Sequence, residues 1–204
     1  MTDKFTLALT SNASEYGIEL CAETVRGLVD YYALLTRWND RLHLVAPCRP
    51  EEFATRHVLE SLLLLRFLPE AVGLADVGSG AGLPVIPCLI AKPDLSATMI
   101  ESSQKKSVFL REAINQLGLA ARGQVVAKPF EETHITNVSF ITCRALDQFT
   151  QKLPMLISWA PAKSTLLLLG GESVRRQLDN LTLHYTEFLV PFSERRFVFE
   201  VRKD

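Results

Sequence analysis

Three glycines spaced two residues apart, Gly78, Gly80 and Gly82, follow a short apolar run that ends at Asp76. Glycine allows a tight turn and a close backbone approach to a ligand, so this arrangement is typical of a nucleotide-binding loop. A dinucleotide fingerprint, G-x-G-x-x-G, needs its third glycine at a position that Leu83 occupies here. The G-x-G-x-G spacing is instead typical of enzymes that bind S-adenosylmethionine (SAM), although glycine clusters also form ordinary turns.

An acidic residue, Glu101, ends the next apolar run, nineteen residues beyond Gly82. A carboxylate at this place can accept hydrogen bonds from both ribose hydroxyls of an adenosine cofactor. The same acid would suit NAD, or could cap the following helix, so it does not select the cofactor by itself. Asp76 either faces the amino-acid end of the cofactor or orients the glycine loop.

Two further strand ends carry candidate site residues. After the third apolar run, Phe130 could stack on adenine beside Glu131, or Phe130 could be a core aromatic. After the fourth run comes Arg144, whose burial without a partner would be costly. A guanidinium can contact a carboxylate or phosphate bidentately, or stack on a base, so we predict that Arg144 is functional.

The elements that position these residues alternate between strands and helices from about residue 72. This alternation implies a mainly parallel sheet covered on both faces, with the ligand over the carboxyl ends of the strands. Two late apolar runs with a turn at Pro191 and Ser193 predict an antiparallel hairpin that closes the sheet. The expected strands are 74–77, 97–100, 124–127, 140–143, 165–169, 185–190 and 196–201, and the expected helices follow Pro84 and cover 104–117, 149–159 and 172–181.

We therefore predict an α/β fold: a Rossmann-like SAM-dependent methyltransferase domain with a seven-stranded sheet over residues 71–204, and an N-terminal helical extension over 1–70. A further helix is expected from near Glu51 to a stop before Pro69. A helical apolar stripe in the extension is expected to pack on the body of the protein. Its members are Tyr31, Leu34, Leu35, Trp38 and Leu42.

The chain has 204 residues, of which 48% are hydrophobic, and a formal net charge of −1. This charge excludes a global basic field, so any RNA contact must use local patches. Four scattered cysteines without a C-x-x-C pair favour reduced thiols, and we predict no bound metal. No apolar run approaches the roughly 18–20 residues that span a bilayer, so we predict a cytoplasmic protein without membrane contact.

Basic residues gather in three groups, each of which is either a solvated face or a phosphate contact. Within one of them, Arg56 and Glu60 have the i,i+4 spacing of a helical ion pair. His57 lacks neighbouring metal ligands, so we interpret it as structural or substrate-facing. The groups are Lys105, Lys106 and Arg111; Arg37, Arg41, Arg49, Arg56 and His57; and Arg195, Arg196, Arg202 and Lys203.

From about Tyr32 to Gly171 the chain resembles the glucose-inhibited division protein B family, the bacterial 16S rRNA guanine-N7 methyltransferases of small-subunit type G. The run D-V-G-[ST]-G-x-G-L-P-x-I-P, preceded by R-H-x-x-[DE]-S, is far more specific than the glycines alone. The residues that carry the resemblance are Trp38-Asn39, Arg56 to Ser61, Asp76 to Pro84 with Ile86-Pro87, Pro93, Glu101-Ser102 with Lys105-Lys106 and Phe109-Leu110, Phe130-Glu131 and Arg144-Ala145.

The resemblance implies transfer of the SAM methyl group to N7 of a guanine in the 530 loop of 16S rRNA. It also implies that 16S rRNA or the small ribosomal subunit is the partner, and we expect a monomer. Guanine N7 carries a free lone pair, so no general base is needed, and Arg144 is expected to position substrate or cofactor. The residues matching the family's cofactor pocket are Gly78, Leu83, Phe130, Glu131 and Arg144.

The chain departs from the family pattern at four places. His43 stands where the pattern has its second asparagine, Pro129 replaces an arginine, Cys143 replaces a serine, and Gly170 replaces a lysine. Two alternatives therefore stay open: a divergent SAM-binding protein with weak or altered methyltransferase activity, and, given the near-neutral charge, a methyltransferase for a small molecule.

Overall fold

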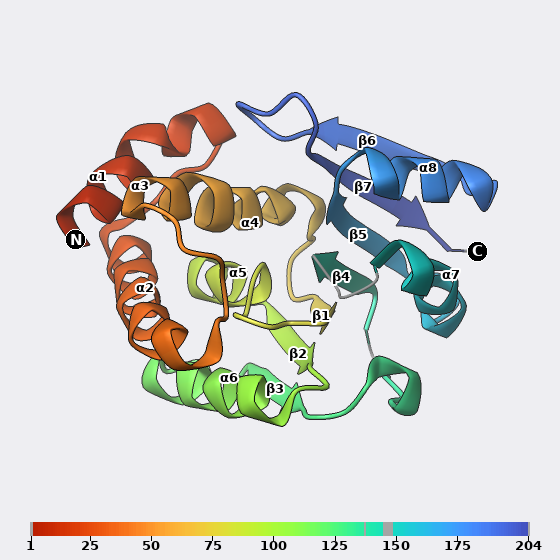
Figure 1. Cartoon of the computed structure of the whole chain (residues 1–204), viewed down its shortest axis with the longest axis horizontal. Coiled ribbons are helices and arrows are strands. Elements are labelled where there is room, and N and C mark those ends of the chain that lie inside the picture. The colour runs from red at the N-terminus through yellow and green to blue at the C-terminus, as the bar shows by residue number, and fades with distance from the viewer. Residues whose placement is uncertain (1, 137, 145–148, 204) are drawn as a thin grey trace.

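A computed structural model describes residues 2–136, 138–144 and 149–203 of the chain (Figure 1). Seven strands form one sheet in the order β3-β2-β1-β4-β5-β7-β6. The first five pair in parallel, and β7 runs antiparallel to both β5 and β6. The strands are β1 Gly73–Val77, β2 Ser96–Ile100, β3 Gly123–Val126, β4 Phe140–Arg144, β5 Thr165–Gly170, β6 Tyr185–Leu189 and β7 Phe197–Arg202.

Helices cover both faces of this sheet. The first part of the chain is helical and lies on the same side as α5 and α6, whereas α7 and α8 lie on the other side (Figure 1). The described helices are α1 Thr2–Asn12, η1 Ala13–Tyr16, α2 Ala22–Leu42, α3 Pro50–Glu52, η2 Phe53–Leu59, α4 Glu60–Leu62, η3 Leu63–Phe67, α5 Val85–Ala91, α6 Gln104–Gln116, η4 Phe130–Glu132, α7 Phe149–Trp159 and α8 Glu172–Asn180.

The interior strand β5 shows why both faces are covered. Its leucines alternate: Leu167 and Leu169 belong to the hydrophobic cluster on the side of α5 and α6, and Leu166 and Leu168 to the cluster with α7 and α8. All four are buried. A parallel strand with such a continuous apolar run is stable only between two helical layers.

The predicted α/β fold is confirmed, including the seven strands, the antiparallel C-terminal hairpin and the helices between the strands. The apolar stripe of α2 packs as expected, because Tyr31, Leu34 and Leu35 are buried in one hydrophobic cluster and Trp38 and Leu42 pack against that cluster. Buried residues of the N-terminal helices share one cluster with the sheet face. The division of the chain between residues 70 and 71 stays a prediction.

The expected helix after residue 50 is helical throughout, but it is not one regular α-helix. Its centre, η2, is a π-helix over Phe53–Leu59, in which the Glu60 N–H donates to the Thr55 carbonyl five residues back. Such turns are rare and widen the helix locally. This one presents Arg56 and His57, two of the residues singled out above.

No helix in the described ranges is both long enough and apolar enough to cross a membrane.

Candidate active site

The glycine turn connects β1 to α5 at the carboxyl edge of the sheet. Gly78, Gly80 and Gly82 all have positive φ, at 74°, 51° and 82°. A Cβ atom at Gly82 would overlap the side chain of Ile86, because it would lie only 2.7 Å from Cγ1 of Ile86. From α2, the buried Tyr31 hydroxyl donates to the Ala81 carbonyl over 2.8 Å and fixes the turn. The turn therefore depends on glycine for both backbone conformation and space.

Glu101 is joined to this turn by backbone hydrogen bonds. Its Oε2 accepts from the Gly80 N–H and its Oε1 from the Ser103 N–H, both over 2.8 Å. The residue is only 6% exposed. An ionised carboxylate has about four acceptor positions, so two remain for a ligand. Glu101 thus orients the turn and can still accept hydrogen bonds from ribose hydroxyls.

A cavity of about 390 Å³ lies over the carboxyl ends of the strands and brings together five of the eight predicted cofactor residues. Its wall also includes His57, Lys106 and Lys152. A larger hollow of about 800 Å³, beside β6 and β7, is lined by other residues. The predicted residues on the cavity wall are Gly78, Gly80, Leu83, Glu101 and Arg144.

Asp76 lies beneath the cavity. It is 1% exposed, its Oδ1 accepts a 2.7 Å hydrogen bond from the Thr142 hydroxyl, and its Oδ2 has no partner among the described residues. Burial raises the pKa of this carboxyl to about 7, against smaller opposing effects of its hydrogen bonds to Ser79 and Thr142. The unpaired oxygen leaves Asp76 an acceptor that a ligand or a water could use.

Phe130 and Glu131 are not among the residues that line the cavity. Phe130 is buried and packs edge-on against Trp159, with ring centroids 5.4 Å apart. Glu131 forms a 3.3 Å ion pair with Lys152, which does line the cavity. In this arrangement Phe130 is a core aromatic, and its contact with adenine stays a prediction.

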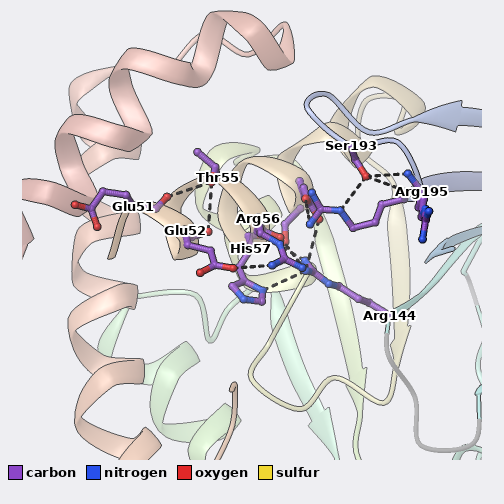
Figure 2. Close-up of polar contacts among 11 residues, drawn as sticks. Glu51, Glu52, Thr55, Arg56, His57, Arg144, Ser193 and Arg195 are labelled. Atoms are coloured by element: carbon purple, nitrogen blue, oxygen red, sulfur yellow. Dashed lines mark hydrogen bonds and ion pairs between the residues drawn. The ribbon is translucent and has the colours of Figure 1, made fainter. Parts of the chain in front are cut away.

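Arg144 ends β4 and reaches across to the π-helix, as Figure 2 shows. Its Nη2 donates to the Arg56 carbonyl over 2.9 Å and lies 3.1 Å from Nδ1 of His57. Its side chain is only 16% exposed. The prediction that a buried arginine here needs partners is met by the backbone of η2. Ala145, the next residue of the motif, lies outside the described residues.

Glu60 lies between two guanidinium groups. Its Oε2 is 3.7 Å from Nη2 of Arg144. Its Oε1 is 2.8 Å from Nη1 of Arg196, which makes an ion pair but does not meet the geometry of a hydrogen bond. Glu60 is 3% exposed, so burial raises the pKa of its carboxyl, while the nearby arginines oppose this. The suggested helical pair of Arg56 with Glu60 is wrong, because Arg56 pairs with Glu52 over 2.6 Å instead.

His57 packs against the Phe53 ring and faces Arg144. Burial, together with the charges of Arg144 and Arg56, lowers the pKa of its imidazole to about 4. The ring is therefore neutral near pH 7. The described His, Cys, Asp and Glu side chains form no group of three that could hold a metal ion.

Residues outside our site prediction complete the cluster around Arg144: Glu60 and Arg196. The spacing of Glu60 suggests a pair with Arg56 and gives no sign of its contacts with Arg144 and Arg196, and nothing in the sequence distinguishes Arg196 from the other residues of its basic group. In that group Arg202 pairs with Glu200 over 3.0 Å, and the Lys203 ammonium donates to carbonyls at the end of α7, including that of Ile157. Arg196 alone of these three residues reaches the site described here.

The model of the family GidB, described as rRNA small subunit methyltransferase G, matches residues 24–196. The chain belongs to this family. It is 36% identical over 173 residues to the ribosomal RNA small subunit methyltransferase G of Halorhodospira halophila, covering 85% of this chain and 82% of that protein. It is 38% identical over 177 residues to the protein of the same name from Xylella fastidiosa, covering 84% and 82%.

Solved structures support the fold. A SAM-dependent methyltransferase from Aquifex aeolicus superposes with a TM-score of 0.60 at 16% identity, covering 84% of this chain and 98% of that one. The magnesium protoporphyrin IX methyltransferase of Synechocystis gives a TM-score of 0.61 at 13% identity, covering 91% and 99%. Family membership and fold together show a SAM-dependent rRNA methyltransferase with a Rossmann-like sheet.

Proposed function

We propose that this member of the rRNA small subunit methyltransferase G family methylates N7 of a guanine in the 530 loop of 16S rRNA. The observation that supports the proposal is one cavity whose wall joins the glycine turn and Glu101 to Arg144 and His57. We further propose that the enzyme acts as a monomer in the cytoplasm.

The residues on the cofactor side fit SAM. The glycine turn brings backbone close to the cavity, the Glu101 carboxylate keeps acceptor positions for ribose hydroxyls, and Asp76 retains an unpaired buried oxygen below the turn. Gly78, Gly80, Leu83 and Glu101 would hold the cofactor directly. Asp76, Phe130 and Glu131 would support the pocket from behind or join it after side-chain movement.

The chemistry requires alignment more than proton transfer. SAM supplies an electrophilic methyl group on a sulfonium. N7 of guanine has a lone pair and no proton to lose, so the protein need only hold the base in line and exclude water. This agrees with a cavity wall on which we assign no side chain as a general base.

Arg144 is suited to positioning because its own place is fixed. Its guanidinium is held by the carbonyl of Arg56, by the His57 ring and by Glu60. Three of its five N–H groups are used, by the carbonyls of Arg56 and His57 and by Nδ1 of His57. The remaining donors can face a phosphate or base in the cavity.

The test is methylation of 16S rRNA by the purified protein with radiolabelled SAM, using naked RNA and small ribosomal subunits in parallel. We expect label at one guanine, mapped by primer extension after chemical cleavage at 7-methylguanosine. Arg144→Ala should lower transfer by about a hundredfold while SAM affinity changes by less than about threefold.

Two other results would replace the proposal. Tight SAM binding without labelling of any ribosomal substrate would indicate a divergent SAM-binding protein, the alternative that the departures at His43, Pro129, Cys143 and Gly170 suggest. Labelling of small metabolites alone would indicate a small-molecule methyltransferase.

A further inference from the structure

The imidazole of His57 has a defined tautomer in this site. Its Nδ1 lies 3.1 Å from Nη2 of Arg144. A guanidinium nitrogen only donates hydrogen bonds, so Nδ1 must accept, and the proton of the neutral ring must be on Nε2. His57 is therefore a neutral N–H donor whose donor position is set by Arg144.

That donor is available to a ligand. His57 lines the same cavity as the glycine turn and Arg144, and it is only partly buried. Within the described residues, Nδ1 is the ring nitrogen that has a hydrogen-bond partner, and Nε2 has none. The Phe53 ring, with its centroid 5.1 Å away, and the contact to Arg144 restrict the imidazole on two sides.

We infer that His57 is the residue that selects guanine, by donating from Nε2–H to the O6 atom of the target base. This inference rests on the proposed reaction at guanine N7. The edge of guanine that carries N7 also carries O6, and both are acceptors, whereas adenine presents an amino donor in place of O6. A fixed donor beside O6 binds guanine and faces an N–H group in adenine, so it rejects adenine.

A neutral donor suits this reaction better than a cationic one. Methyl transfer from a sulfonium to N7 places positive charge on the base, so an added cation next to it would oppose the transition state. The Nη2 group of Arg144 is not available to O6, because both of its hydrogens are used by the Arg56 carbonyl and by Nδ1 of His57. The lowered pKa of His57, about 4, keeps the ring neutral near pH 7.

The experiment pairs a protein change with a single-atom change in the RNA. The target guanine is replaced by 6-thioguanine, which retains N7 but has a weaker acceptor at position 6, or by inosine, which keeps O6. For the wild type, we expect kcat/KM to fall by about tenfold to a hundredfold on 6-thioguanine and by much less on inosine.

His57→Ala should lower kcat/KM by a similar factor on guanine and on inosine, but should add little further loss on 6-thioguanine. His57→Gln offers an amide oxygen to Arg144 and an N–H to the base, so it should keep a preference for guanine over 6-thioguanine. SAM affinity and thermal unfolding are measured for each variant as controls for folding. If His57→Ala does not fold, the comparison is made with His57→Gln alone.

An equal loss on guanine and 6-thioguanine in His57→Ala, or a folded His57→Gln without a preference for guanine, would overturn the inference. His57 would then act only by holding Arg144. In both cases the wild-type enzyme would still form 7-methylguanosine in 16S rRNA. Failure of the proposed function is a different result, because the wild type would then label no guanine.

Discussion

The glycine turn lines the same cavity as Arg144 and His57, but it is built differently from the cluster that these two residues form with Glu60 and Arg196. The turn is held by backbone groups: Gly78 N–H donates to the Ile100 carbonyl over 2.9 Å, and Gly80 N–H donates to Glu101. The arginine cluster is held by ion pairs and hydrogen bonds between distant segments. Arg144 reaches carbonyls 87 and 88 residues earlier in the chain.

The two regions should therefore tolerate substitutions for different physical reasons. Backbone conformation sets the turn, so its tolerance depends on the space around each Cα atom. The cluster depends on the contact of η2 and α4 with the carboxyl end of β4, and on the pairing of the β6–β7 hairpin with β5. A change that shifts one of these elements should alter substrate handling while cofactor binding survives.

The largest effect is expected at Gly82 in the turn. Gly82→Ala places a methyl group against Ile86 at a φ of 82°, so we expect a loss of about 3 kcal/mol in unfolding free energy and at least a tenfold loss of SAM affinity. Calorimetric titration measures the SAM affinity, and urea denaturation measures the free energy of unfolding. Gly118→Ala is the control, because its φ is 69° and its Cβ would meet nothing within 4 Å. Equal effects of the two variants would contradict the role of close packing.

A second test concerns Asp76 beneath the turn. Its pKa of about 7 is raised in the folded state, so the folded state binds its proton more tightly, and stability must fall as pH rises from about 4 to 7. Ionisation of Asp76 should therefore lower the free energy of unfolding by about 2 to 3 kcal/mol between pH 5 and pH 8. Asp76→Asn, which can still accept from Thr142, should remove this loss in urea denaturation at the two pH values.

His57 titrates in the opposite sense, because its lowered pKa makes stability fall as pH decreases from about 6.5 to 4. Comparing wild type and Asp76→Asn at each pH cancels this contribution. If the free energy of unfolding changed with pH in the same way for both proteins, ionisation of Asp76 would not destabilise the folded state.

In the arginine cluster, Glu60→Gln should cost about 2 kcal/mol, because it leaves two guanidiniums without their shared carboxylate. The cost is reduced because the Arg196 side chain is 31% exposed. Transfer should fall about tenfold with SAM affinity nearly unchanged. Glu52→Gln breaks an exposed pair with Arg56 and should cost less than about 1 kcal/mol. If both substitutions had the same small effect, Glu60 would not hold Arg144.

The smallest effect is expected at Lys106, on the cavity wall. Lys106→Ala should weaken RNA binding by about threefold without changing SAM affinity. It should also reduce the slope of the logarithm of the RNA-binding constant against the logarithm of salt concentration by about one. Filter binding at several salt concentrations gives both values. Lys163→Ala is matched in charge but lies before the amino end of β5, at the opposite edge of the sheet, so it should have no effect.

Much of this arrangement could be predicted from local pattern. Apolar runs such as 165–169 and the hairpin residues near Pro191 predicted β5, β6 and β7 within one or two residues of their bounds. The regular strand–helix alternation then placed Glu101 and Arg144 at one edge of the sheet. The π-helix was not predictable, because its hydrogen bonds depend on packing that periodicity does not record.

Ion pairs could not be predicted from residue spacing. The i,i+4 spacing of Arg56 fits both Glu52 and Glu60, and the structure selects Glu52 because Glu60 is buried toward Arg144 and Arg196. Likewise, Phe130 could face a ligand or the core from sequence alone, and its neighbour Trp159 lies 29 residues further along the chain.

The sheet, the glycine turn and the position of Glu101 at the end of the second strand were predictable from the sequence, because each depends on backbone preferences and on local apolar pattern. The packed chain was needed to find that Glu101 holds the turn, that Glu60 and Arg196 join Arg144, and that His57 turns Nδ1 toward the guanidinium. The contacts within the arginine cluster join residues more than 80 positions apart. Their pairing depends on burial and on competing partners of similar charge, which only the packed chain distinguishes.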